Sequence, residues 1–126
     1  METFSQSAEM YLETLLVLKK RKSVVRAVDI ATELGYSKPS VSRALGNLNA
    51  DGMITVDGSG YIDFTEKGRA YVERLYERHT VLTEILTKVG VSSEVAEEDA
   101  CRIEHVISDQ TFAAIKDYLT KQKNQD

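Results

Sequence analysis

The segment Cys101-Arg102-Ile103-Glu104-His105 gathers three side chains that can each donate a lone pair to a cation. On an α-helix, residues three and four apart share one face, so Cys101, Glu104 and His105 are expected side by side. A thiolate, a carboxylate and an imidazole together suit a divalent transition-metal ion. The alternative is that Cys101 packs in the core while Glu104 and His105 are solvated. The spacing alone leaves both interpretations open.

Two other segments offer candidate ligands for the same ion. Met10 and Glu13 lie three residues apart on one face of an expected N-terminal helix, and His79 lies on a long helix near the middle of the chain. Taken singly, each has an ordinary explanation. A methionine at a helix start is more often a core residue, a glutamate a solvated charge, and a lone histidine a surface or core residue.

A second kind of chemistry, contact with DNA, is indicated by residues 37–43. This segment is rich in small and basic side chains and opens a helix, whose N-terminus favours phosphate. Arg43 is long enough to fork onto a guanine edge, and Lys38 suits a phosphate. The alternative is a helical hairpin with a serine-rich cap. The predicted DNA-contacting residues are Ser37, Lys38, Pro39, Ser40, Ser42 and Arg43.

Helical spacing of apolar residues and local stop signals predict the elements that position these groups. Two β-prone runs, residues 53–56 and 61–64, flank Asp57-Gly58-Ser59-Gly60, which is a hairpin signal. The expected helices cover residues 6–21 and 27–34, Ser37 to Asp51-Gly52, Thr65 to Val89-Gly90, Ser92 or Ser93 to about Ile107, and Ser108 or Asp109 through Leu119, with a frayed polar tail at residues 121–126.

This order predicts a mainly α fold with a small β-hairpin wing: a winged helix-turn-helix followed by a helical dimerisation domain. We expect the DNA-binding domain at residues 1–64 and the metal-binding and dimerisation domain at residues 65–126. Val106, Phe112, Ile115 and Leu119 are candidates for the dimer interface, with the intrachain core as the alternative.

Bulk composition is compatible with this interpretation. The 126 residues are 42% hydrophobic, enough for a core, and the net charge is −4. The charge is uneven, because residues 1–50 carry seven basic and five acidic side chains while the remainder is acidic. A basic N-terminal part fits a local DNA-binding face, although ordinary scatter of surface charge is the alternative. The sequence contains no apolar run long enough for a membrane span and no signal-peptide core, so we expect a cytoplasmic protein.

The chain resembles the diphtheria toxin repressor family, which includes the manganese transport regulators. The resemblance covers nearly the whole chain and rests on Glu9-Met10-Tyr11-Leu12, residues 37–43, Arg78-His79 and the stretch from Asp99 to Asp109. It implies homodimeric repressors that bind a palindromic double-stranded DNA operator only when loaded with Fe(II) or Mn(II). Long members of the family carry a third, SH3-like domain, and this chain is expected to be of the short form without it.

The resemblance also implies a ligand set. It implies a primary site from Met10, Cys101, Glu104 and His105, and a second site close by that uses His79. Glu13 matches a glutamate that joins both ions in manganese-type members. The sequence departs from the family at Thr83, because many members have a glutamate four residues after the histidine, whereas here Glu84 is five after.

The donor types favour Fe(II). Thiolate and thioether are softer than carboxylate and move preference from Mn(II) toward Fe(II), Co(II) and Ni(II). Cellular availability makes Fe(II) the first expectation and Mn(II) the alternative, while Co(II), Ni(II) or Zn(II) are expected to bind in vitro. No membrane partner and no small-molecule substrate are expected.

Two rival functions remain at this point. A winged-helix regulator that senses an organic ligand would explain residues 1–64 equally well. A metallohydrolase is the remote rival, because Cys-x-x-Glu-His is similar to an inverted zincin pattern, but a catalytic ion needs an open coordination position. We therefore expect a regulator and not an enzyme.

Overall fold

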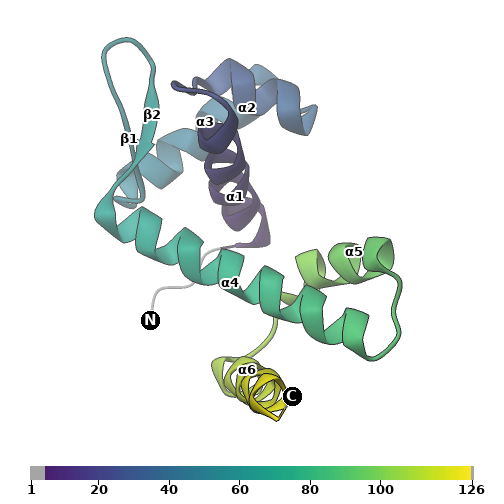
Figure 1. Ribbon diagram of the computed structural model, residues 1–126. Helices are drawn as coiled ribbons and strands as arrows, with labels where there is room; N and C mark the ends of the chain where they lie inside the picture. The colour runs from purple at the N-terminus through teal and green to yellow at the C-terminus, as the bar shows by residue number, and fades with distance from the viewer. Residues whose placement is uncertain (1–4, 126) are drawn as a thin grey trace. The chain divides into compact units, whose positions relative to one another are not determined.

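The computed structural model describes residues 5–125 as six helices and one two-stranded antiparallel sheet (Figure 1). The order confirms the predicted mainly α fold with a β-hairpin wing. The elements are α1 (Gln6–Arg21), α2 (Ala27–Leu34), α3 (Lys38–Ala50), β1 (Ile54–Val56), β2 (Ile62–Phe64), α4 (Glu66–Lys88), α5 (Ser93–Ile103) and α6 (Asp109–Asn124). The chain forms two compact units that divide after Glu73, so α4 contributes to both. No helix within residues 5–125 is long and apolar enough to cross a membrane.

Serine side chains define where most of the helices begin. The hydroxyl of Ser5 accepts from the backbone N–H of Ala8 at 3.1 Å, and that of Ser108 accepts from Thr111 at 3.1 Å. Ser37 and Ser92 cap α3 and α5 in the same way. Each hydroxyl satisfies a backbone donor that the first helical turn leaves without an intrahelical partner. The predicted start of every one of these helices is therefore confirmed.

The first unit has a continuous apolar core beneath α1, α2, α3 and the hairpin. Its members at or near zero exposure come from each of these elements: Leu12, Leu15, Ile30, Val41 and Ile54. In the hairpin, Thr55 pairs with Asp63 and Val56 with Ile62. Ile54 and Ile62 are buried, whereas Thr55, Val56 and Asp63 are exposed, so these two isoleucines fix the wing against the helices.

The turn between the hairpin and α4 is closely packed. The backbone N–H of Thr65 donates to the carbonyl of Met53 at 3.1 Å, and its hydroxyl donates to the carbonyl of Gly52 at 2.6 Å. The same hydroxyl accepts from the N–H of Gly68 at 3.0 Å. Gly68 lies so near this turn that an added Cβ would meet the Met53 carbonyl oxygen at 1.9 Å. A side chain at position 68 would therefore clash with the backbone of this turn.

The second unit has a smaller apolar interior. Its buried apolar side chains, none more than 4% exposed, are Leu75, Leu82, Ala96, Ala100 and Leu119. Leu119, a candidate for the dimer interface, is 4% exposed in the protomer and so belongs to the intrachain core, the alternative stated for it. Phe112 and Ile115 are half-buried, whereas Val106 is 77% exposed.

Two predicted helix boundaries in this unit are wrong. The helix expected to reach about Ile107 ends at Ile103, and residues 104–106 form a turn. The tail expected to fray continues α6 through Asn124, with Thr120 bonded to the carbonyl of Lys116 and Lys123 paired with Glu84 of α4. Polarity of the tail does not oppose a helix, because charged side chains are good helix formers at the surface.

Asp29 is expected to make the start of α2 sensitive to acid. Its carboxylate accepts from Lys22 at 2.5 Å and from the backbone N–H of Arg26 at 2.8 Å, and these bonds, Lys22 first, lower the pKa of Asp29. A lowered folded pKa gives stability that is present above the unfolded pKa of about 4 and lost as pH falls through the folded value. Asp29→Ala should therefore lower the free energy of unfolding by about 1 kcal/mol at pH 7, and by less at pH 3.

Urea unfolding at the two pH values measures this difference. Glu33→Ala is the control, since Glu33 forms a more exposed pair with Arg21 and is expected to matter little. An Asp29→Ala deficit of the same size at both pH values would show that the carboxylate charge is not the cause.

Candidate functional site

The predicted DNA-contacting residues lie along the outer side of α3. Val41, Leu45 and Leu48 form its buried side, at 6% exposure or less. The N-terminal half of the opposite side is open: Ser37, Lys38, Pro39, Ser42 and Arg43 are exposed and Ser40 is half-buried. The Ser37 cap gives this helix start a fixed geometry, with the Ser37 and Ser40 hydroxyls 3.0 Å apart.

The charges around this surface are arranged differently from what composition indicates. Most of the basic run at residues 19–22 is used within the first unit: Lys19 pairs with Asp63, Arg21 with Glu33 and Lys22 with Asp29. Within residues 5–125, by contrast, Lys38 and Arg43 make no ion pair or hydrogen bond. Lys38 and Arg43 on the outer side of α3 are therefore available to an anionic partner, whereas three of the four residues in the basic run are already paired with acids.

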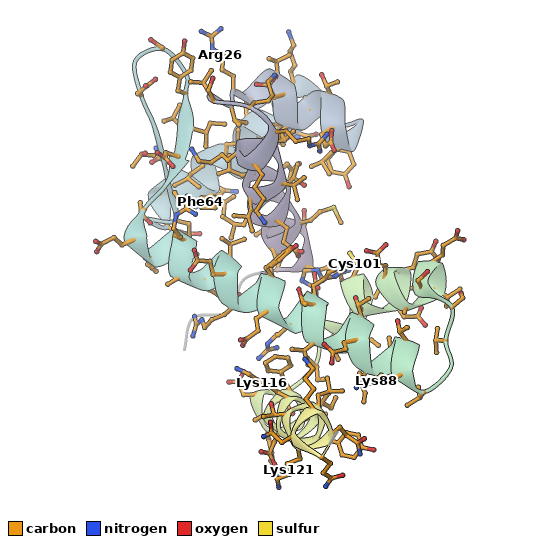
Figure 2. All side chains as sticks on the ribbon, in the orientation of Figure 1. Arg26, Phe64, Lys88, Cys101, Lys116 and Lys121 are labelled. Carbon is orange, nitrogen blue, oxygen red and sulfur yellow. The ribbon has the colours of Figure 1, made fainter. Side chains whose placement is uncertain are left out.

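Arg26 is a further basic residue near this surface, and the sequence did not indicate its place there. It lies just before α2 and beside the hairpin (Figure 2), with its guanidinium 4.8 Å from the centre of the Tyr61 ring and bonded to the Tyr61 hydroxyl at 3.2 Å. Arg26 and Ser42 line the same groove, about 460 Å³ in volume, between the helices and the wing. No local pattern links Arg26 to Tyr61, because 35 positions separate them.

Three of the predicted metal ligands converge in the second unit. One donor atom from each of Cys101, Glu104 and His105 lies within 4.8 Å of the other two. Two donors each about 2.1–2.3 Å from one ion are at most about 4.6 Å apart, so a small adjustment lets these three bind one cation. Cys101, labelled on α5 in Figure 2, is exposed and so accessible, whereas Glu104 is 1% exposed.

His79 joins this cluster from α4. Its Nδ1 is 3.0 Å from one carboxylate oxygen of Glu104, and Nε2 of His105 is 3.4 Å from the other. Glu104 therefore lies between two imidazoles. A buried carboxylate flanked by nitrogen donors and a thiol provides a mixed donor set suited to Fe(II), Co(II), Ni(II) or Zn(II).

The cluster forms although Glu104 and His105 lie beyond the last helical residue. The backbone of Glu104 keeps helical angles (φ −58°, ψ −25°), and its N–H donates to Ala100 at 2.9 Å. The next N–H groups fold back on Arg102 and Ile103 and close the turn. The i, i+3, i+4 spacing thus produces the predicted proximity even though the helix is shorter than predicted.

Met10 and Glu13 lie on α1, in the first unit, and both are half-buried. The sulfur of Met10 accepts a hydrogen bond from the hydroxyl of Tyr36 at 3.8 Å. The neighbouring Glu9 is 7% exposed and accepts from the hydroxyl of Tyr71 at 2.7 Å, which ties this turn of α1 to α4. That Met10 and Glu13 bind an ion together with His79, Cys101, Glu104 and His105 stays a prediction.

Thr83 and Glu84 differ in what they contact. The Thr83 hydroxyl donates to the carbonyl of His79 at 2.8 Å, so it is bonded to its own helix. Glu84 forms an ion pair with Lys123 of α6. Neither side chain belongs to the cluster of converging donor atoms from Cys101, Glu104 and His105.

Comparison with known proteins agrees with both halves of this arrangement. Residues 3–61 match the model described as the N-terminal DNA-binding domain of the iron-dependent repressors, and residues 65–125 match their metal-binding and dimerisation domain. The chain belongs to this family. The resemblance to the diphtheria toxin repressors and manganese regulators is thereby confirmed.

Two curated relatives illustrate the family. The iron-dependent repressor IdeR of Mycobacterium tuberculosis (strain ATCC 25618 / H37Rv) is 33% identical over 110 residues, which are 86% of this chain and 48% of the relative. The transcriptional regulator MntR of Escherichia coli O6:H1 is 32% identical over 111 residues, covering 88% of this chain and 72% of the relative. The chain therefore spans about half the length of the mycobacterial relatives it matches.

Solved structures agree on the fold. The metal-dependent transcriptional regulator MtsR superposes with a TM-score of 0.81 at 22% identity, over 90% of this chain and 53% of the other. The manganese regulator SloR gives 0.76 at 23% identity, over 90% and 53%. The winged helix-turn-helix followed by a helical domain is thus the family's fold.

Proposed function

We propose that this chain is a metal-dependent transcriptional repressor that binds operator DNA as a homodimer when loaded with Fe(II), or alternatively Mn(II), and so controls metal homeostasis. The observation that carries the proposal is the convergence of Cys101, Glu104 and His105 within 4.8 Å, around a buried carboxylate. It occurs in a chain whose other unit leaves the basic outer side of α3 open. The proposed setting is the cytoplasm of a bacterial cell, and no enzymatic activity is proposed.

The proposed metal ligands are Cys101, Glu104 and His105 with His79, joined by Met10 and Glu13 from α1. A bound divalent ion supplies the positive charge around which these donors gather. Without that charge, the carboxylates of Glu13 and Glu104 repel each other when brought close. Because the proposed ligands come from both halves of the chain, metal binding would favour one of two placements of the DNA-binding unit over the other. The proposed functional division is residues 1–64 and 65–126.

The proposed DNA contacts are made by the start of α3. Arg43 reads a base edge, Lys38 neutralises a phosphate, and the small side chains of Ser37, Ser40 and Ser42 with Pro39 allow close approach. Two such helices in a homodimer match half-sites about 34 Å apart, and hence a palindrome. Val106, at 77% exposure, with the half-buried Phe112 and Ile115, supplies apolar surface for the dimer.

Selection from a random double-stranded DNA library tests this function without assuming any operator sequence. The protein is incubated anaerobically with the library in Fe(II), in Mn(II), or in chelator. We expect a palindromic sequence to be enriched with either metal and not with chelator. Fe(II) should produce this enrichment at a lower concentration than Mn(II) does. Enrichment of the same palindrome in chelator would instead favour a regulator that senses an organic ligand.

The same selection is repeated with the variant Arg43→Ala. The side chain is exposed and has no partner within residues 5–125, so the fold should be unaffected. The selected palindrome should lose preference at one position in each half-site, by about 1–3 kcal/mol per bidentate contact. An unchanged palindrome would contradict base reading by Arg43, while leaving metal dependence intact.

A further inference from the structure

Arg78 of α4 is bonded to the backbone of the segment that carries the metal cluster. Its Nη1 donates to the carbonyl of Ile107 at 2.8 Å and to that of Glu104 at 3.5 Å. Its Nη2 pairs with the carboxylate of Asp109, and its guanidinium lies 5.5 Å from the centre of the Phe112 ring. With 19% side-chain exposure, Arg78 is largely enclosed by the turn between α5 and α6.

These contacts bond the turn that follows the end of α5. The last carbonyl groups of a helix have no N–H partner within that helix, and a cation near that end is favoured by the helix dipole. The last carbonyls of α5 accept from the backbone N–H groups of residues 104–107, and Arg78 donates to the carbonyls of Glu104 and Ile107 just beyond the helix end. Because guanidinium donors have a rigid planar geometry, the two carbonyls and Asp109 are held in one fixed arrangement.

The next residue of α4 acts on the same ligand. His79 contacts the side chain of Glu104 at 3.0 Å, while Arg78 contacts its carbonyl oxygen. Consecutive residues of one helix therefore fix both the backbone and the carboxylate of Glu104. The second unit has fewer buried apolar side chains than the first, so these polar contacts are a larger share of what holds the turn.

We infer that Arg78 is a positioning residue of the metal centre: it sets the α5–α6 turn so that Glu104 and His105 face Cys101 before an ion arrives. The inference rests on the proposed metal function. Arg78 itself carries a permanent positive charge and does not bind the ion. Its removal leaves every proposed ligand in the chain but lets the turn relax, so the ligands must be ordered at the expense of binding affinity.

Anaerobic titration with Co(II) tests the inference directly. Binding is followed through the thiolate-to-cobalt charge-transfer band that ligation by Cys101 produces, and through the weaker visible bands that report coordination geometry. Arg78→Gln should bind Co(II) about 10- to 100-fold more weakly than the wild-type chain, with altered visible bands at saturation. Arg78→Lys, which keeps the charge and one donor group but not the fork, should recover part of the affinity.

Lys116→Gln is the matched control. Lys116, labelled on α6 in Figure 2, pairs with Glu77 of α4 at 3.0 Å and is remote in sequence from the α5–α6 turn. The variant removes a link between the same two helices, so its Co(II) affinity and spectrum should match the wild type. Thermal unfolding of each metal-free variant, followed by circular dichroism, separates loss of stability from loss of affinity.

The outcomes distinguish this inference from the proposed function. Wild-type protein that shows no cobalt–thiolate band would contradict the proposed metal centre itself. A normal wild-type band with equal affinity and spectrum in Arg78→Gln would overturn only the positioning role. If Arg78→Gln does not fold, Arg78→Lys and Asp109→Asn carry the comparison, since each removes part of the network. Wild-type affinity and spectrum in both would then overturn the inference.

Discussion

Glu104→Gln is expected to weaken divalent-metal binding by at least about 100-fold, or roughly 2.7 kcal/mol. Glu104 is 1% exposed and lies within 3.4 Å of both neighbouring imidazoles, so its carboxylate is the centre of the cluster. Gln keeps the shape and removes the charge. The loss should exceed that for a residue that only supports a ligand, since Glu104 is a proposed direct ligand of the ion.

The metal-free variant should be as stable as the wild-type chain, or more so. Burial of a carboxylate carries a desolvation cost, which a neutral amide of the same size lowers. The expected pattern is therefore opposite in the two states: unchanged or higher melting temperature without metal, and little or no stabilisation by metal. Thermal unfolding with chelator and with Mn(II) or Co(II) measures both quantities in one experiment.

Glu98→Gln is the matched control for this substitution. Glu98 lies on the same helix, is exposed, and is absent from the cluster of converging donor atoms. It should bind metal as the wild type does. Wild-type affinity in Glu104→Gln would remove the central ligand from the proposed site, and equal weakening in both variants would indicate a general effect of charge.

Gly68→Ala is expected to lower the free energy of unfolding of the first unit by about 3 kcal/mol. By helix propensity alone, alanine in a helix is more favourable than glycine by up to about 1 kcal/mol. Here the added Cβ would lie 1.9 Å from the carbonyl oxygen of Met53, which is backbone and cannot turn away. Relief requires the start of α4 to move, at the cost of the bonds from Thr65 to Met53 and Gly52.

Gly46→Ala on α3 tests the opposite sign. A Cβ built at Gly46 meets nothing within 4 Å, so this substitution should stabilise the chain by up to about 1 kcal/mol. Urea unfolding of both variants, followed by circular dichroism, makes the comparison. Stabilisation by Gly68→Ala would show that the hairpin and α4 are not packed as described. Destabilisation by Gly46→Ala would show that the outer side of α3 is not open at position 46 as described.

Features that depend on neighbours in the chain were predictable from the sequence. The serine caps, the end of α2 at Gly35 and the hairpin around Asp57 to Gly60 act over a few residues, so their chemistry can be read locally. The proximity of Cys101, Glu104 and His105 belongs to the same class, since helical geometry alone brings positions three and four apart together.

Features that join distant segments were decided only by the tertiary structure. The turn after Ile103 is bonded by Arg78 of α4, which donates to the carbonyls of Glu104 and Ile107. Likewise, only the tertiary structure pairs Lys19 with Asp63 and Lys22 with Asp29, and brings the Met53 carbonyl against Gly68. In each case the competing partner lies several residues away or on another element, and a linear pattern carries no information about which distant groups folding brings together.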